Sequence, residues 1–142
     1  MRLVLDTDVL TAALRSDRGA SRRLLVGALA GRFEVLVSVP LMIEYEAVLT
    51  REEHLAAAGA SVEDVMTVLD ALASVLEPVR LSFLWRPMLP DANDDMVLET
   101  AVNGRADVLV TFNRRHFEAA SSEFGIEVAS PAEALRRLRG IA

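Results

Sequence analysis

The first ten residues of the chain, MRLVLDTDVL, constrain its fold more than any other stretch. Residues 3–5 are apolar without the polar alternation of a half-exposed strand, which favours a buried parallel strand. Asp6 and Asp8 follow this strand directly. Ligands of open α/β sheets bind outside the carboxyl ends of the strands. The two carboxylates are therefore expected at the edge of the sheet where a ligand would bind.

The rest of the sequence alternates between strand-like and helix-like segments. Further strands are expected at residues 33–39, 79–83, 107–111 and 126–128. Helices are expected at residues 9–14, 20–30, 41–51, 62–76, 91–104, 114–120 and 131–139. Ser61 with Asp64 three residues later predicts a capping box at the start of one of them. This order predicts a single three-layer α/β/α domain over residues 1–142, with a mainly parallel central sheet of about five strands.

Composition narrows the possible chemistry. The chain has no cysteine, which excludes disulfides and cysteine-ligated zinc and is compatible with a reducing cytoplasm. Its net charge of −6 suits a protein that gathers carboxylates around a cation better than one that grips nucleic acid by charge alone. All 15 basic residues are arginine. The apolar runs are too short to span a bilayer, so we expect a cytoplasmic protein without a membrane partner.

Two carboxylates are predicted on the apolar stripes of helices. Glu44 shares a stripe with Leu41 and Val48, and Asp94 shares one with Val97 and Leu98. A carboxylate in such a place is costly unless it is paired or bound to a cation. Together with Asp6, these residues suggest a shared divalent ion, and ligands that offer only oxygen suit Mg²⁺ or Mn²⁺. Such ions serve phosphoryl chemistry.

Several of these polar residues also have a purely structural interpretation. Asp6 or Asp8 would cap a helix that begins near Val9, and Asp91 would cap the helix that contains Asp94. Glu44 would be explained equally by a buried ion pair with an arginine. Asp95 and Glu99 are expected on a solvated face of their helix. His54 and His116 are single histidines that are not expected to take part in catalysis.

Four segments occur along nearly the whole chain in a fixed order: LVLDTDVL, SVPLMIEYEAVL, PDANDDMVLETA, and DVLVTFNRRHF followed by IEVASPAEAL. In this order and spacing they resemble the PIN-domain nucleases, and within them the VapC-like toxins of bacterial toxin–antitoxin pairs. The resemblance implies an acidic cluster that binds Mg²⁺ (or Mn²⁺) and hydrolyses RNA. Asp6, Glu44 and Asp94 match the metal-binding and catalytic positions, with the register at Asp94 and Asp95 ambiguous by one residue.

The resemblance extends to further positions and includes two departures. Asn113 stands where the family has a fourth catalytic acid, and Asp8 stands where the family often has asparagine or serine. The additional metal-ligand candidates are Asp8, Asp91 and Asp95. The residues expected to position ligands or phosphates are Thr7, Thr111, Arg114 and Arg115, with Arg22 and Arg23 as a second candidate patch.

The resemblance also implies partners, and it leaves alternatives open. Toxins of this group are typically homodimers that pair with a small antitoxin, and residues 62–76 offer an apolar helix for either contact. A PIN-like scaffold without turnover is an alternative, which Asn113 favours. A haloacid-dehalogenase-type phosphatase would fit Asp6 and Asp8, but the chain has no lysine and this reading leaves Glu44 unexplained. A P-loop NTPase is excluded, because its motif is missing.

Overall fold

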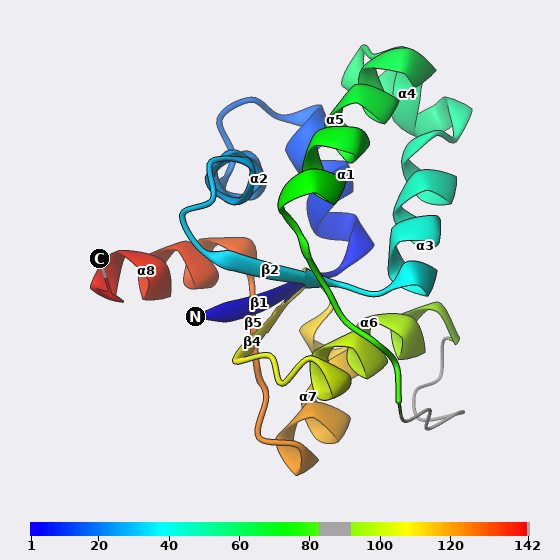
Figure 1. The fold of residues 1–142 in the computed structure, drawn as a ribbon. Helices are drawn as coiled ribbons and strands as arrows, with labels where there is room; N and C mark the ends of the chain where they lie inside the picture. Colours follow the sequence, from blue (N-terminus) through cyan, green and yellow to red (C-terminus); the bar gives the residue numbers. More distant parts are fainter. Residues whose placement is uncertain (83–91, 142) are drawn as a thin grey trace.

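A computed structural model describes residues 1–82 and 92–141 of the chain. Its centre is a five-stranded sheet in the order β3-β2-β1-β4-β5, in which every neighbouring pair is parallel (Figure 1). The strands are β1 (Arg2–Leu5), β2 (Glu34–Val37), β3 (Glu77–Pro78), β4 (Val108–Val110) and β5 (Glu127–Ala129). The predicted parallel sheet is confirmed.

Helices cover both faces of the sheet, with α6 and α7 on the side opposite α1, α2 and α5 (Figure 1). The helices are α1 (Thr7–Arg15), α2 (Ala20–Leu29), α3 (Val39–Leu49), α4 (Glu52–Ala58), α5 (Val62–Val75), α6 (Ala92–Asn103), α7 (Arg114–Glu123) and α8 (Pro131–Ile141). The three-layer α/β/α architecture is therefore confirmed. Within the described residues, no helix is long and apolar enough to cross a membrane.

The central strand β1 is enclosed from both sides. Leu3, Val4 and Leu5 are each 2% exposed or less, as the apolar run predicted. The hydroxyl of the buried Tyr45 donates a hydrogen bond to the carbonyl of Leu5, which fixes α3 to the carboxyl end of this strand. The residues that follow Leu5 therefore leave the core at a well-defined place.

Side-chain caps determine where two helices begin. The hydroxyl of Ser38 accepts the N–H of Leu41 at 3.3 Å and lies 2.7 Å from the hydroxyl of Thr100, which ties the start of α3 to α6. At α5, the predicted capping box is confirmed by reciprocal bonds of 3.1 and 3.0 Å between Ser61 and Asp64. These bonds lower the pKa of Asp64.

Two local predictions were wrong. The short helix α4 was not expected, since none of its residues is buried and it has no apolar stripe; it ends where Gly59 takes a left-handed φ of 65°. Residues 79–82 do not form the expected strand, whose last position, residue 83, lies outside the described residues. The strand is β3 instead, which includes Pro78 because an edge strand tolerates a missing N–H.

Candidate active site

Asp6 lies at the carboxyl end of β1 and is also the N-cap of α1. One carboxylate oxygen accepts the N–H of Thr7 at 2.8 Å, and the other accepts the hydroxyl of Thr111 at 2.7 Å. The side chain is buried, and this burial, together with the nearby charge of Asp94, raises its pKa to about 6 against the opposing effect of the two hydrogen bonds. Asp6 thus caps the helix and also stands in an acidic environment.

Asp8 lies in the first turn of α1 and faces the loop that follows β4. Its Oδ2 accepts the side-chain amide of Asn113 at 3.0 Å and the N–H of Phe112 at 3.3 Å. Its Oδ1 is buried and has no hydrogen-bond partner among the residues that the structure describes. Burial, and then the charge of Asp6, raise the pKa of Asp8 to about 7. A buried carboxylate oxygen that lacks a donor is suited to a cation.

Asp94 completes what we call the acidic cluster, which consists of Asp6, Asp8 and Asp94. It lies in the first turn of α6 and is 8% exposed. Its Oδ2 lies 3.0 Å from Nδ1 of His116, within hydrogen-bond distance. Its charge contributes to the raised pKa values of both other aspartates. In the ambiguous pair, it is therefore Asp94 whose charge acts on Asp6.

Three residues of α6 and α7 were misjudged from the sequence. Asp95 and Glu99 were expected on a solvated face, but they are 1% and 0% exposed, because α6 packs against the sheet and also against α3 and α7. His116 was expected outside the chemistry, yet it contacts Asp94. The signal that could have identified it is its spacing, three residues after Asn113 and one turn into α7.

The candidate positioning residues divide into two groups. The hydroxyl of Thr111 donates to Asp6 and accepts the N–H of Asn113 at 2.9 Å. Since Asn113 in turn donates to Asp8, Thr111 connects Asp6 to the partner of Asp8. Arg114 instead forms ion pairs with Glu133 at 2.8 Å and Glu118 at 3.6 Å. Arg115 is exposed and has no ion pair within the described residues.

Glu44 does not join the cluster through any contact. It is half-buried on α3, whose buried residues are Leu41, Tyr45 and Leu49 rather than the predicted stripe through Val48. In the described part of the chain, Glu44 forms no hydrogen bond or ion pair, so the alternative of a buried arginine pair is wrong. Asp91 lies outside the described residues.

The fit of a metal ion rests on the acidic cluster. Across residues 1–82 and 92–141, no three carboxylate or imidazole groups stand close enough to hold an ion as they are placed. The donor set is nevertheless suitable: Asp6 is buried and Asp8 half-buried, their pKa values are raised, and Oδ1 of Asp8 is a buried oxygen without a hydrogen-bond partner among the described residues. A divalent cation would relieve all three features.

A hollow of about 380 Å³ opens beside the cluster. Its lining includes Thr7, Asp8, Phe112 and His54. Nη2 of Arg15 lies 2.7 Å from Nδ1 of His54 within this lining. The hollow gives the half-buried Asp8 access from outside. By contrast, Arg22 and Arg23, the second candidate patch, line a different hollow that contains no residue of the acidic cluster.

Comparison with known proteins was informative at the level of family and fold. The profile of the PIN domain matches residues 2–115. The VapBC2 structure from Rickettsia felis bound to a promoter DNA fragment contains a similar chain, with a TM-score of 0.61 and 16% identity over 92% of this chain and 98% of that one. The DNA-bound VapBC structure from Salmonella typhimurium gives a TM-score of 0.62 and 19% identity over the same shares. No curated protein matches the sequence.

Proposed function

Because the chain belongs to the PIN domain family, we propose that it is a metal-dependent ribonuclease that hydrolyses RNA phosphodiester bonds and acts as the toxin of a toxin–antitoxin pair. The observation that carries this proposal is the acidic cluster at the carboxyl edge of the sheet. Three aspartates from α1, α6 and the end of β1 converge there, at an electrostatic cost that a cation would offset. The likeness in fold to chains of VapBC complexes supports the toxin assignment.

Asp6 and Asp94 are the proposed primary ligands, with Glu44 as the third and Asp8, Asp91 and Asp95 as further candidates. A bound Mg²⁺ or Mn²⁺ would acidify a water molecule and stabilise the leaving oxygen of the phosphodiester. The protein's own contribution is to hold the carboxylates in place. Thr111 and the N–H of Thr7 fix both oxygens of Asp6.

Side chains from the loop after β4 and from α7 orient the other two aspartates of the cluster. Asn113 donates to Asp8, so the residue at the family's fourth acidic position acts here as a hydrogen-bond donor. His116 plays the corresponding part for Asp94. Of the two arginines that follow Asn113, we assign Arg115 to an RNA phosphate, since Arg114 is engaged with Glu133 and Glu118.

Exposed apolar side chains near the carboxyl edge support a protein partner. Val39 and Ile43 on α3 are 73% and 61% exposed, and Phe112, which follows β4, is 53% exposed. The apolar residues of α5 are less available, because Val65, Leu69 and Leu72 are buried and, among its large apolar side chains, only the terminal Val62 and Val75 are exposed. We therefore place the contacts with an antitoxin and in a homodimer on α3 and Phe112.

The test is cleavage of a panel of labelled structured RNAs by the purified protein with Mg²⁺, with Mn²⁺ and with EDTA. The Asp6→Ala variant is compared with Asp70→Ala, which removes an exposed aspartate of α5 outside the cluster. We expect cleavage that requires the metal, is lost in Asp6→Ala and is retained in Asp70→Ala. Mn²⁺ binding is measured on the same samples by calorimetry. Absence of both cleavage and Mn²⁺ binding would establish the non-catalytic scaffold instead.

A further inference from the structure

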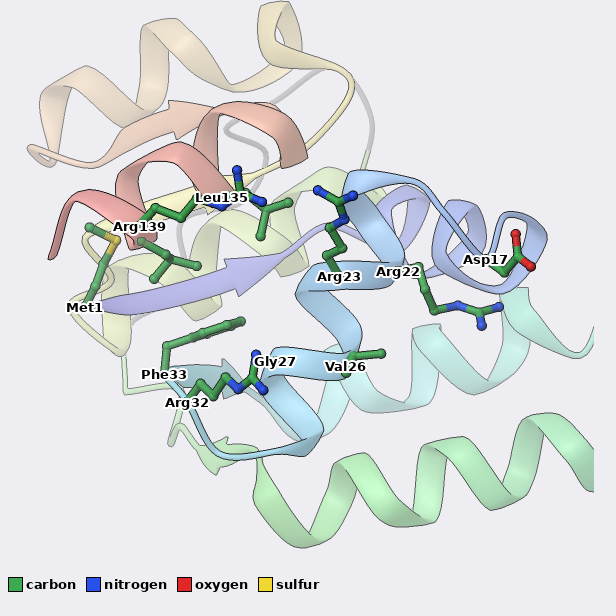
Figure 2. Close-up of a pocket in the computed structure, with 11 residues that line it drawn as sticks. Met1, Asp17, Arg22, Arg23, Val26, Gly27, Arg32, Phe33, Leu135 and Arg139 are labelled. Atoms are coloured by element: carbon green, nitrogen blue, oxygen red, sulfur yellow. The ribbon is translucent and has the colours of Figure 1, made fainter. Parts of the chain in front are cut away.

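A second hollow, of about 690 Å³, opens at the amino-terminal edge of the sheet (Figure 2). Met1 precedes β1 and Phe33 precedes β2, so the strands of the sheet separate this hollow from the acidic cluster at their carboxyl ends. Its other walls come from α2 and α8. The volume lies within the range of about 300–1,000 Å³ that small-molecule and peptide side-chain pockets occupy.

Arginines surround this hollow. Arg22 and Arg23 extend from α2, Arg32 from the turn before β2, and Arg139 from α8, whereas Asp17 is the one acidic residue among the described residues of the lining (Figure 2). The hollow is thus positively charged, although the chain as a whole has a net charge of −6. The hollow therefore has the opposite electrostatic character to the molecule as a whole.

Most of these arginines have no side-chain partner within residues 1–82 and 92–141. Nε of Arg22 donates to the carbonyl of Ala13 at 2.6 Å. Arg23, Arg32 and Arg139 form no side-chain hydrogen bond or ion pair with any residue that the structure describes. Arginines elsewhere behave differently: Arg2 contacts two glutamates at 2.9 and 3.1 Å. The guanidinium groups at the hollow are thus available to an external anion.

The floor between the arginines is apolar. It is formed by Met1, Val26, Phe33, Leu135 and Leu138. The ring of Phe33 packs on α2 at Gly27, where a Cβ would lie only 2.6 Å from its Cε1 atom. Val26, which is 49% exposed, extends the apolar surface toward the opening. An occupant of this hollow must therefore offer apolar groups as well as negative charge.

We propose that this hollow is a docking site for an acidic peptide segment of a partner protein. The segment places apolar side chains on the floor, and its carboxylates meet Arg23, Arg32 and Arg139. An apolar centre with a charged rim is the usual anatomy of a protein–protein contact, and arginine is enriched in such contacts. The proposal does not depend on the nuclease activity, since the two edges share no residue.

The observations favour a peptide over an RNA strand. Single-stranded RNA is held by aromatic rings that offer a face for base stacking. Phe33 is the one aromatic residue in the part of the lining that the structure describes, it is half-buried, and its ring is packed against α2. The aliphatic side chains of Leu135, Leu138 and Val26 have no counterpart on a phosphate backbone.

The experiment uses fluorescence anisotropy of the intact protein with labelled twelve-residue peptides, about twelve residues being enough to span such a hollow. One peptide alternates glutamate with leucine and phenylalanine, a second has glutamine in place of glutamate, and a third has arginine. A labelled single-stranded RNA of matched length is the fourth probe. The protein variants are the triple charge reversal Arg23→Glu, Arg32→Glu, Arg139→Glu, and the control Arg51→Glu, which reverses an exposed arginine between α3 and α4 that does not line this hollow.

We expect the acidic peptide to bind about tenfold more tightly than the glutamine peptide, with an affinity that falls as salt is added. The triple reversal should abolish this preference, while Arg51→Glu keeps it; circular dichroism reports whether each variant is folded. Equal binding of the acidic and glutamine peptides would overturn the proposal. So would an RNA affinity that exceeds the peptide affinity and disappears in the triple reversal, or self-association of the protein that the triple reversal abolishes.

Discussion

The two edges of the central sheet handle charge in opposite ways. At the carboxyl edge, Asp6, Asp8 and Asp94 are crowded together and largely buried, and hydrogen bonds from neighbouring groups hold them in place. At the amino edge, Arg23, Arg32 and Arg139 are exposed and unpaired within the described residues. Like charges that are buried cost stability and create a high affinity for a small cation. Like charges that are spread around an open hollow cost little and attract a large anion from a distance.

This contrast predicts different consequences of mutation at the two edges. At the carboxyl edge, a single side chain should matter greatly, because each oxygen has a defined neighbour. At the amino edge, several side chains should have to change together, because each contributes to a shared field. The predictions below test this difference.

The largest effect is expected for Asp94→Asn, which should reduce RNA cleavage at least about a hundredfold, since loss of a metal-holding charge costs several kcal/mol of transition-state stabilisation. Asp94→Asn should leave the melting temperature nearly unchanged. Asp95→Asn is the matched comparison: Asp95 is 1% exposed, so this change should mainly lower the melting temperature. Cleavage kinetics and calorimetric melting of both variants check the prediction. A cleavage defect confined to Asp95→Asn would transfer the role from one aspartate to the other.

The second prediction concerns Asp8→Asn, which should raise the stability of the metal-free protein and lower its affinity for Mn²⁺. Folding raises the pKa of Asp8 to about 7 from an unfolded value of about 3.9. The folded state thus favours the protonated form, so this group stabilises the protein below pH 4, and its contribution is lost as the pH rises through 7. Asp8→Asn keeps an acceptor oxygen for Asn113 and Phe112 but removes the charge.

In EDTA at pH 8, Asp8→Asn should therefore raise the free energy of unfolding, on the order of 1–3 kcal/mol. The gain should shrink toward zero at pH 4, while the affinity for Mn²⁺ at pH 8 should fall. Urea titrations at the two pH values and Mn²⁺ calorimetry measure both changes. A variant less stable than the wild type at pH 8 would show that the Asp8 charge is not a burden on the fold.

The third prediction is a stability control, Ser61→Ala, which changes a residue outside both edges of the sheet. Ser61→Ala removes half of the capping box at α5 and should cost about 1 kcal/mol of stability. Cleavage and acidic-peptide binding, measured well below the melting temperature, should stay at wild-type levels. Thermal melting compared with both assays tests this expectation. Loss of either activity would mean that the two edges respond to stability alone, and the effects of Asp94→Asn would need reinterpretation.

The carboxyl edge was largely predictable from sequence, because its geometry follows from local patterns. An apolar run that ends in Asp6, and an acidic helix start at Asp94, place carboxylates at strand ends once the sheet is known to be parallel. His116 was missed because its contact with Asp94 depends on how α7 packs beside α6, which no periodicity encodes. The burial of Asp95 and Glu99 was missed for a related reason, since helix amphipathicity assumes one covered face and α6 has more than one.

The amino edge could not be predicted in the same way. Arg22 and Arg23 are adjacent in sequence and were recognised as a patch, but Arg139 is more than a hundred residues away and enters through the packing of α8 on α2. The hollow also depends on Gly27, whose missing side chain lets Phe33 pack closely. Neither fact follows from the residue types, because both arise from tertiary contacts between elements that are far apart in the sequence.

The smallest effect is expected when the amino edge is altered and the carboxyl edge is assayed. A strand of four residues such as β1 spans about 13 Å, and charges further apart than about 8 Å are largely screened at physiological salt. The triple reversal at Arg23, Arg32 and Arg139 should therefore change metal-dependent RNA cleavage by no more than about twofold under these conditions. Steady-state cleavage at low and at saturating RNA separates binding from turnover. If instead the KM rises strongly while kcat is constant, the RNA must extend across both edges, and the arginines would serve the nuclease rather than a separate protein contact.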